Sequence, residues 1–459
     1  MMSRSRDPLL VLAAAVFIAS LATRTIWWSH AYFHPDESTA LWMALDAVRH
    51  PVLPDHGLVS HYQAFQPPGL VWITAPFVAI GGGRPEVVIV GFGVLNAAAI
   101  AFLAHTVARA WGVVQAVVMS AFLTVGPDAP MSMWIWHPSL FTGTVSLLIA
   151  AGIRLRSGSR WWAGVIMAIP GLYALIHYSG FVLFASAVVL LLMSRRRRTD
   201  LAVPILAGLA LTLVAWVPFL VFEAHRDWED FRLILHGSDT QHTLLGKLHE
   251  RLHATTFAVK HLGRGVYSRV HLTPLILAGA IGSVLLAARR RFADATMVLP
   301  ALVLAAGLAA QIATNQGRRT DVLMLWLPPL YIMCGSAVAQ LCDLASAHLK
   351  AFSARALRVS IASAAVAAVV LAGGLDLHRF IDGSPQLTLG HALGVARAGG
   401  PVGFTLNSAD GLYLACDPPY GWGSQIWYLE EVEHPGEGIR AATRAHAFAN
   451  RHGGCTTRR

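Results

Sequence analysis

The chain has 459 residues, of which 55% are hydrophobic and only 13% are charged. Soluble globular proteins carry roughly a quarter charged residues, so this composition excludes an ordinary soluble protein and indicates a chain folded in a bilayer. The net charge of +10 would suit a nucleic-acid partner if the basic residues gathered on one surface. They lie instead in short connections between apolar runs, which argues against nucleic acid and is typical of membrane topology.

The apolar runs predict the fold class. A spanning α-helix needs about 20 predominantly apolar residues. The longest runs that are nearly free of charge are Pro8–Trp27, Val87–Ala110, Leu201–Phe222, Val322–Leu341 and Val359–Leu375. Shorter runs are Trp111–Val125, Pro138–Ile153, Trp161–Ile176, Tyr178–Met193, Leu272–Ala288 and Met297–Ala313. We therefore expect an all-α polytopic membrane protein with about eleven transmembrane helices.

The basic clusters predict which side each loop faces. They are Arg4 with Arg6, Arg154–Arg160, Arg195–Arg198, Arg289–Arg291 and Lys350–Arg358. With a cytoplasmic N-terminus and about eleven alternating helices, all of them fall on the cytoplasmic side, as the positive-inside rule requires. Residues 29–68, 223–271 and 376–459 then lie outside. The first apolar run with "FIASLA" is also similar to a signal peptide, although we favour a retained anchor.

The predicted organisation is therefore a transmembrane domain over 1–375 and a small extracytoplasmic region over 376–459, in the inner membrane of a bacterium. Two cysteines, Cys416 and Cys455, fall in that outside region, where a disulfide between them is permitted but not required. Cys334 and Cys342 lie in one apolar run and are expected to be small buried residues.

The first outside loop carries two adjacent acids, Asp36 and Glu37, in "YFHPDESTALW". Pro35 suits the first position of a helix, and the helix dipole favours acids in the first turn. Leu41, Ala44, Leu45 and Val48 would then share one face, which suits a helix lying along the membrane surface. The acids either cap this interfacial helix or supply a general base to a lipid-borne substrate, and the local pattern leaves both open.

Two further segments carry a resemblance to a known family. "HYQAFQPPGLVWITAPFVAIGG" (His61–Gly82) follows the acidic pair, and "NQGRRTDVLMLWLPPLY" (Asn315–Tyr331) lies far downstream. With "HPDE" and the topology, they resemble the GT-C superfamily of polyprenyl-phosphate-sugar-dependent glycosyltransferases. The likeness is to the bacterial branch related to protein O-mannosyltransferases and lipid A aminoarabinose transferase, and the "HPDE" spelling is similar to GPI-type mannosyltransferases. It covers roughly the first 110 residues and the later segment, and implies a GT-C fold.

The resemblance implies a role for each matching residue. Asp36 would be the catalytic base, and Glu37 would support it. Arg318 and Arg319 would hold the donor phosphate, since guanidinium forks match phosphate oxygens, or they are a solvated loop pair.

Gln66 departs from the pattern, because relatives often have histidine or lysine before the proline. This removes a positive contact and puts a phosphate-binding role for this position in doubt. His61 could compensate, or it is an interfacial histidine with its own partners.

The implied activity is inverting transfer of a sugar from a polyprenyl phosphate to a lipid, glycan or protein acceptor on the outer face of the membrane. A metal ion is not required, because the donor carries one phosphate that arginines can neutralise; a divalent metal stays possible but is not predicted. The expected partners are the lipid-linked donor, the acceptor and membrane lipids, with no nucleic acid.

A rival motif lies in the second large outside loop, where His249, Glu250 and His253 spell H-E-x-x-H. On a helix this spacing can place two imidazoles on zinc with a glutamate as base, as in metalloproteases. The usual third ligand is missing, since no glutamate lies between Glu250 and Glu430. The alternatives to a glycosyltransferase are therefore a membrane zinc protease at this motif and a transporter or flippase.

Three other ionisable residues, His137, His177 and Glu223, lie near the ends of apolar runs. Ionisable groups at membrane depth are candidates for function, but the sequence names no partner for any of them.

Overall fold

The structure of the chain is a computed structural model. It describes residues 7–31, 33, 35–59, 64–126, 128–194, 196–236, 253, 272–289, 295–313, 325–347, 349–382, 388–390, 392–393 and 424–436. Within these ranges the chain is mostly helical. Extended pairing is limited there to isolated bridges, such as Val59 with Phe65.

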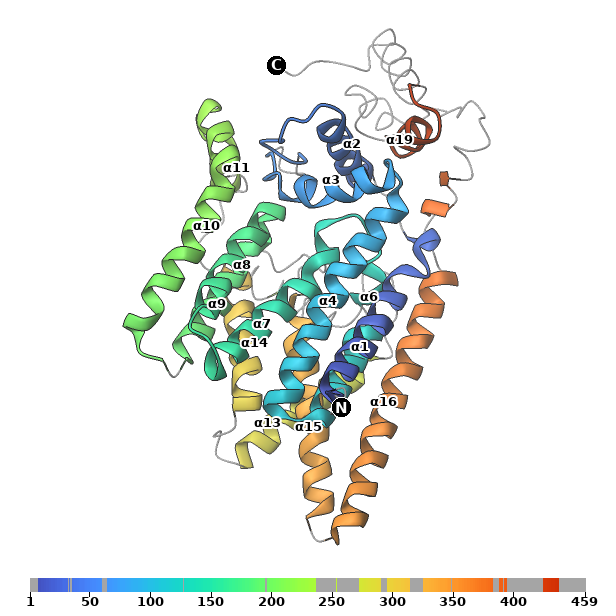
Figure 1. Cartoon of the computed structure of the whole chain (residues 1–459), viewed down its shortest axis with the longest axis vertical. Helices are drawn as coiled ribbons and strands as arrows, with labels where there is room; N and C mark the ends of the chain where they lie inside the picture. The colour runs from blue at the N-terminus through green and yellow to red at the C-terminus, as the bar shows by residue number, and fades with distance from the viewer. Residues whose placement is uncertain are drawn as a thin grey trace, which may run out of the picture.

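The helices follow one another in a bundle with a separate layer at one end (Figure 1). The N-terminal half comprises α1 (Pro8–Thr25), η1 (Trp28–His30), α2 (Pro35–Arg49), α3 (Gly69–Gly81), α4 (Pro85–Trp111), α5 (Val113–Val125), α6 (Asp128–Met131), η2 (His137–Leu140), α7 (Phe141–Ser157), α8 (Trp162–Ile176), η3 (Tyr178–Val182) and α9 (Leu183–Leu192). The rest comprises α10 (Arg198–His225), α11 (Glu229–His236), α13 (Leu272–Arg289), α14 (Ala295–Ala313), α15 (Leu327–Ser346), α16 (Ala351–Asp382) and α19 (Ser424–Glu433).

Six of the described helical segments are long and apolar enough to cross a membrane, by length and composition: Pro8–Thr25, Pro85–Trp111, His137–Ser157, Arg198–His225, Leu327–Ser346 and Ala351–Arg379. Shorter apolar helices include α3, α5, α8, α9 and parts of α13 and α14. Each apolar run identified in the sequence coincides with a helix. The polytopic helical class is confirmed, whereas a count of about eleven spans stays a prediction.

Burial separates central from peripheral helices. Buried residues make up 83% of the apolar window that contains α7, 72% of that in α15 and 56% of that in α4, against 11–22% in α1, α10 and α16. Helices α4, α7 and α15 therefore form the centre of the bundle. Helix α1 packs on α4, α10 packs on α8, and α16 packs on α5 and α15.

The separate layer consists of α2, α3 and α19, which gather at one end of the bundle (Figure 1). Helix α2 packs against both α3 and α19. Its residues Leu41, Ala44 and Leu45 are buried, and Val48 is exposed. The apolar face is therefore covered by protein at Leu41, Ala44 and Leu45, because α2 packs against α3 and α19. The location of α2 at the membrane surface stays a prediction.

A glycine turn joins this layer to the bundle. Gly82 and Gly83 follow α3 with φ of 59° and 91°, a left-handed conformation that other residues adopt only with strain. Pro85 then occupies the first turn of α4, where its missing N–H costs no hydrogen bond. The turn reverses the chain, so that α4 runs from this layer to the opposite end of the bundle (Figure 1).

Candidate functional site

The acidic pair begins α2, as predicted. The helix starts at Pro35, and Asp36 and Glu37 both lie in its first turn. Adjacent residues on a helix point about 100° apart, and the two side chains accordingly differ in environment. Asp36 is exposed, whereas Glu37 is only 2% exposed. Of the two, only Asp36 is open to an incoming molecule.

The segment between α2 and α3 is held by backbone hydrogen bonds. The amide of Gly57 donates to the carbonyl of Gln66 at 2.7 Å, and the amide of Gln66 donates to the carbonyl of Leu58 at 2.7 Å. The indole Nε1 of Trp72 donates to the carbonyl of Pro54 at 2.8 Å. These bonds fix the backbone of Gln66, while its side-chain Oε1 is buried and accepts no hydrogen bond within the described part of the chain. An acceptor of this kind suits a hydroxyl or amine donor.

The "QPPG" sequence docks on the end of α8. A Cβ added to Gly69 would lie 2.6 Å from the backbone carbonyl carbon and oxygen of Leu175 and 2.8 Å from the amide nitrogen of Ile176. The phenol of Tyr178 donates to the carbonyl of Phe65 at 2.8 Å. The glycine is therefore required by a close approach between two backbones, and the first loop is fixed to the α8–η3 junction.

Two buried histidines meet at that junction. Helix α8 ends at Ile176, and the rings of His137 and His177 stack with centroids 3.6 Å apart and an interplanar angle of 5°. Nδ1 of His177 accepts a hydrogen bond from the amide of Ser179 at 3.1 Å. The phenol of Tyr173 donates to the carbonyl of His137 at 2.6 Å. The structure thus brings together two residues that the sequence singled out separately.

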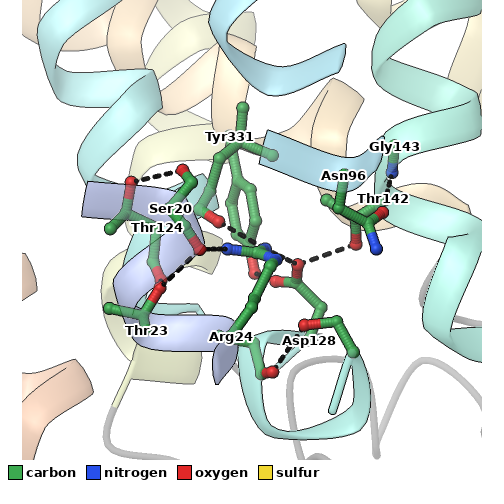
Figure 2. A network of polar contacts seen from close by, with 12 residues as sticks. Ser20, Thr23, Arg24, Asn96, Thr124, Asp128, Thr142, Gly143 and Tyr331 are labelled. Carbon is green, nitrogen blue, oxygen red and sulfur yellow. Dashed lines mark hydrogen bonds and ion pairs between the residues drawn. The ribbon is translucent and has the colours of Figure 1, made fainter. Parts of the chain in front are cut away.

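A buried ion pair that the sequence did not reveal joins α1 to α6 (Figure 2). Nη2 of Arg24 lies 3.0 Å from Oδ2 of Asp128, with the two side chains 0% and 2% exposed. Asp128 also accepts hydrogen bonds from Oγ1 of Thr142 at 2.7 Å and from the phenol of Tyr331 at 3.1 Å. Four elements, α1, α6, α7 and α15, therefore meet at one carboxylate.

Small polar side chains extend the same network (Figure 2). The hydroxyl of Thr23 donates to the carbonyl of Thr124 at 2.8 Å, and the hydroxyls of Ser20 and Thr124 are 3.1 Å apart. On the other side, Oδ1 of Asn96 accepts from the amide of Gly143 at 2.9 Å. Polar contacts of this kind hold helices together where the surroundings offer no water.

Glu223, the third ionisable residue singled out, lies in the last turn of α10. It is fully buried, as is Asp230, whose Oδ1 lies 3.7 Å from Nη2 of Arg226. Nη2 of Arg226 lies 2.9 Å from Oε2 of Glu229, and its guanidinium stands 4.6 Å from the ring centroid of Phe65. The end of α10 therefore contacts the first loop next to Gln66.

Helix α19 fastens the layer from the C-terminal side. The phenol of Tyr428 donates to the carbonyl of Gly83 at 2.5 Å, and its ring packs edge-on against Trp42. Nη1 of Arg49 lies 2.9 Å from Oε1 of Glu431. Both ends of the first loop are therefore held, one by α8 and the other by α19.

Several predicted residues lie outside the described ranges: His61, Arg318, Arg319, His249, Glu250, Cys416 and Cys455. Their roles stay predictions. His253 is described, as an exposed residue in a helical position. Cys334 and Cys342 are buried and free. Among the described residues, no group of three or more His, Cys, Asp and Glu side chains is placed to hold a metal ion.

No protein-family model and no curated protein sequence matches the chain. Solved structures do match. The apo structure of ArnT from Cupriavidus metallidurans aligns with a TM-score of 0.56 and 15% identity over 97% of this chain and 88% of that one. The same protein bound to undecaprenyl phosphate gives 0.52 and 16%, over 96% and 88%.

A second protein, the archaeal oligosaccharyltransferase AglB from Archaeoglobus fulgidus in complex with an inhibitory peptide and a dolichol-phosphate, aligns with a TM-score of 0.53 and 13% identity. The alignment covers 88% of this chain and 59% of AglB. Both matches extend well beyond the two segments that carried the resemblance in sequence. The chain therefore has the GT-C fold, which it shares with ArnT and AglB.

Proposed function

We propose that this protein is an inverting glycosyltransferase. It moves a sugar from a polyprenyl-phosphate donor to a lipid, glycan or protein acceptor on the outer face of a bacterial inner membrane. The observation that carries the proposal is the pair at the start of α2, where Asp36 is exposed and Glu37 is buried. The similarity in fold to ArnT, which was solved with undecaprenyl phosphate bound, supports the choice of donor.

In the proposed reaction Asp36 acts as the general base. Its carboxylate takes the proton from an acceptor hydroxyl or amine, whose lone pair forms a bond to the anomeric carbon of the sugar. The bond from that carbon to the phosphate oxygen breaks on the opposite face, so that the configuration inverts and polyprenyl phosphate leaves with the bonding electrons. The dipole of α2 favours an anion in its first turn, which suits a base at this position.

The other residues position the reactants. Glu37 is too buried to meet the acceptor and would hold the start of α2 in place. The buried Oε1 of Gln66 would accept a hydrogen bond from a sugar hydroxyl, a neutral contact that fits the absence of a positive charge at this position. Arg318 and Arg319 remain the proposed phosphate ligands. A donor with a single phosphate needs no metal ion in this mechanism.

The test uses purified full-length protein with radiolabelled polyprenyl-phosphate sugars and membrane extract as the source of acceptor. Asp36→Asn should lower transfer by about 100- to 10,000-fold, the usual contribution of a general base. Asp46→Asn is the matched control, because Asp46 is an exposed acid on the same helix that pairs with His50 at 3.0 Å. It should leave transfer unchanged.

Undiminished transfer in Asp36→Asn would refute the assignment of the base. Stoichiometric zinc in the purified protein, with proteolytic activity that is lost in His249→Ala and Glu250→Gln but kept in Asp36→Asn, would point instead to the H-E-x-x-H motif. Absence of transfer by the wild type from every donor tested would contradict the proposed class of enzyme.

A further inference from the structure

A basic pocket lies at the end of the bundle opposite α2, α3 and α19. It opens between the ends of α4 and α7 and has a volume of about 410 Å³, within the range of ligand-binding pockets. Helix α4 leads from the α2–α3 layer down to this end, where it finishes at Trp111 (Figure 1). The polar lining consists of Thr106, Arg109, Arg154, Arg156 and Ser157.

Three arginines converge on the pocket, and neither Asp nor Glu is among its lining residues. Arg109 is exposed and makes no hydrogen bond or ion pair with any residue that the structure describes. Arg154 has an aromatic neighbour instead of an acid, since its guanidinium carbon is 6.0 Å from the ring centroid of Trp162. The pocket therefore holds a concentrated positive charge with no carboxylate within it.

Helix capping does not account for Arg109 and Arg154, which make no hydrogen bond with the residues that the structure describes. The carbonyls near the end of α7 are served by Arg196, which donates from Nε to Leu155 at 3.5 Å and from Nη2 to Gly158. The C-termini of α4 and α7 each contribute about half a negative charge. Arg109 and Arg154 alone exceed that sum, so the pocket attracts anions.

A buried hydroxyl points to a ligand independently of the charges. The side chain of Thr106 lines the pocket, is 2% exposed, and its Oγ1 has no hydrogen-bond partner within the described part of the chain. A buried hydroxyl without a partner costs free energy that a bound acceptor would recover. Phosphate oxygens accept from both hydroxyl and guanidinium groups.

We propose that this pocket binds the phosphate of an anionic phospholipid from the membrane leaflet at this end of the bundle. Arginine forks match phosphate oxygens geometrically, and basic pockets between the ends of transmembrane helices recognise anionic headgroups. Trp111 lines the pocket, and Trp162, the first residue of α8, lies against the pocket residue Arg154. Tryptophan is typical of the headgroup level of a bilayer. In the predicted orientation this is the cytoplasmic leaflet.

The test measures lipid binding by the purified full-length protein in detergent, by native mass spectrometry, with phosphatidylglycerol, phosphatidylcholine and inorganic phosphate as separate probes. Wild type should retain one phosphatidylglycerol at least about tenfold more tightly than phosphatidylcholine. Arg109→Gln with Arg154→Gln should weaken phosphatidylglycerol about 25-fold, at about fivefold for each arginine, and abolish the preference.

Arg160→Gln is the matched control. It removes one positive charge at the same end of the bundle, on a residue that faces Trp161 and does not line the pocket. Its preference for phosphatidylglycerol should equal that of wild type. An equal loss in this control would show that only the overall charge of this end matters, and would overturn the pocket.

Thr106→Val keeps the test valid if the double variant fails to fold. It removes the unpartnered hydroxyl without changing the shape of the side chain. The lipid-free protein should become as stable as wild type or more so, while phosphatidylglycerol binds severalfold more weakly. Unchanged affinity for phosphatidylglycerol in Thr106→Val, or in the folded double variant, would overturn the proposal. Retention of inorganic phosphate as tight as that of phosphatidylglycerol in the same measurement would assign the pocket to free phosphate and would overturn the lipid as its source.

Discussion

The buried ion pair between Arg24 and Asp128 gives the most direct test of how the α2–α3 end of the bundle is held together. The change is Asp128→Asn, which keeps the shape of the side chain and removes its charge. The guanidinium of Arg24 is 0% exposed, so it would be left in the protein interior without its counter-ion. Breaking a buried pair from one side costs about 3–5 kcal/mol. Thr142 and Tyr331 each donate a hydrogen bond to the carboxylate of Asp128. In Asp128→Asn the new –NH₂ group would face one of these two donors, and that hydrogen bond would be lost.

The second change removes the charge on the other side. In Arg24→Met with Asp128→Asn no ion is left buried, and replacement of a whole buried pair by neutral side chains is often close to neutral. The remaining losses are two hydrogen bonds from Arg24 to backbone carbonyls, from Nη2 to Leu123 at 2.7 Å and from Nη1 to Ser20 at 3.5 Å. The double variant should therefore be more stable than Asp128→Asn alone. The coupling free energy should be about 2–3 kcal/mol, well above the roughly 0.5 kcal/mol seen for independent sites.

The assay follows the loss of monodisperse full-length protein in detergent after heating. Because such unfolding is often irreversible, all variants must share one heating protocol. Asp128→Asn should lower the midpoint by about 5–10 °C. Asp343→Asn is the control: its partner Arg358 is 3.3 Å away, but both side chains are about half exposed, and such surface pairs contribute at most about 1 kcal/mol. A fall in Asp128→Asn no larger than in Asp343→Asn, or single effects that simply add in the double variant, would refute the buried coupling.

Two further changes test how α2, α3 and α19 are held on the bundle. Gly69→Ala places a Cβ 2.6 Å from the backbone of Leu175, so it should cost about 1–3 kcal/mol of stability and lower sugar transfer. Gly374→Ala is the control: no atom lies within 4 Å of its added Cβ, so it should be neutral or slightly stabilising in the same thermal and transfer assays, and equal behaviour of the two variants would contradict the docking of Gly69 on α8. Tyr428→Phe leaves the carbonyl of Gly83 without its hydrogen-bond donor and should lower the midpoint of thermal unfolding by a few degrees. Because burial raises the pKa of Tyr428, the phenol stays protonated and the loss should be the same at pH 7 and pH 9. An unchanged midpoint would show that α19 is held by other contacts.

The sequence predicted the local features of the fold well, because they depend on short patterns. Apolar length placed the helices of the bundle. A proline ahead of two acids fixed the start of α2 at Pro35, and the break at His177 was visible as an interruption between two apolar runs. Each of these signals is complete within one segment of about 20 residues.

Features that depend on distant segments could not be predicted in this way. Arg24 lies inside an apolar run, and its partner Asp128 is 104 positions away, so no spacing rule connects them. The contact of Arg49 with Glu431 spans 382 positions. The sequence does not show that α19 packs on α2, so the membrane was the one partner that could be predicted for the apolar face of α2. Single charges within otherwise apolar runs were the available signal, and they indicate only that a partner exists.

The two explanations for the acids in "HPDE" are compatible once the residues are considered separately. A first-turn position suits both acids, because the helix dipole favours anions there. It does not account for the different exposure of Asp36 and Glu37. That difference follows from the packing of α2 against α3 and α19, which fixes the rotation of α2 about its axis. If Asp36 is the base, the orientation of its carboxylate depends on residues that hold α2 in place without contacting the substrate, such as Gly69 and Tyr428. Changes at these residues should then lower the rate of transfer at saturating donor more than they weaken donor binding, because a misdirected base impairs the transition state and leaves the bound ground state intact.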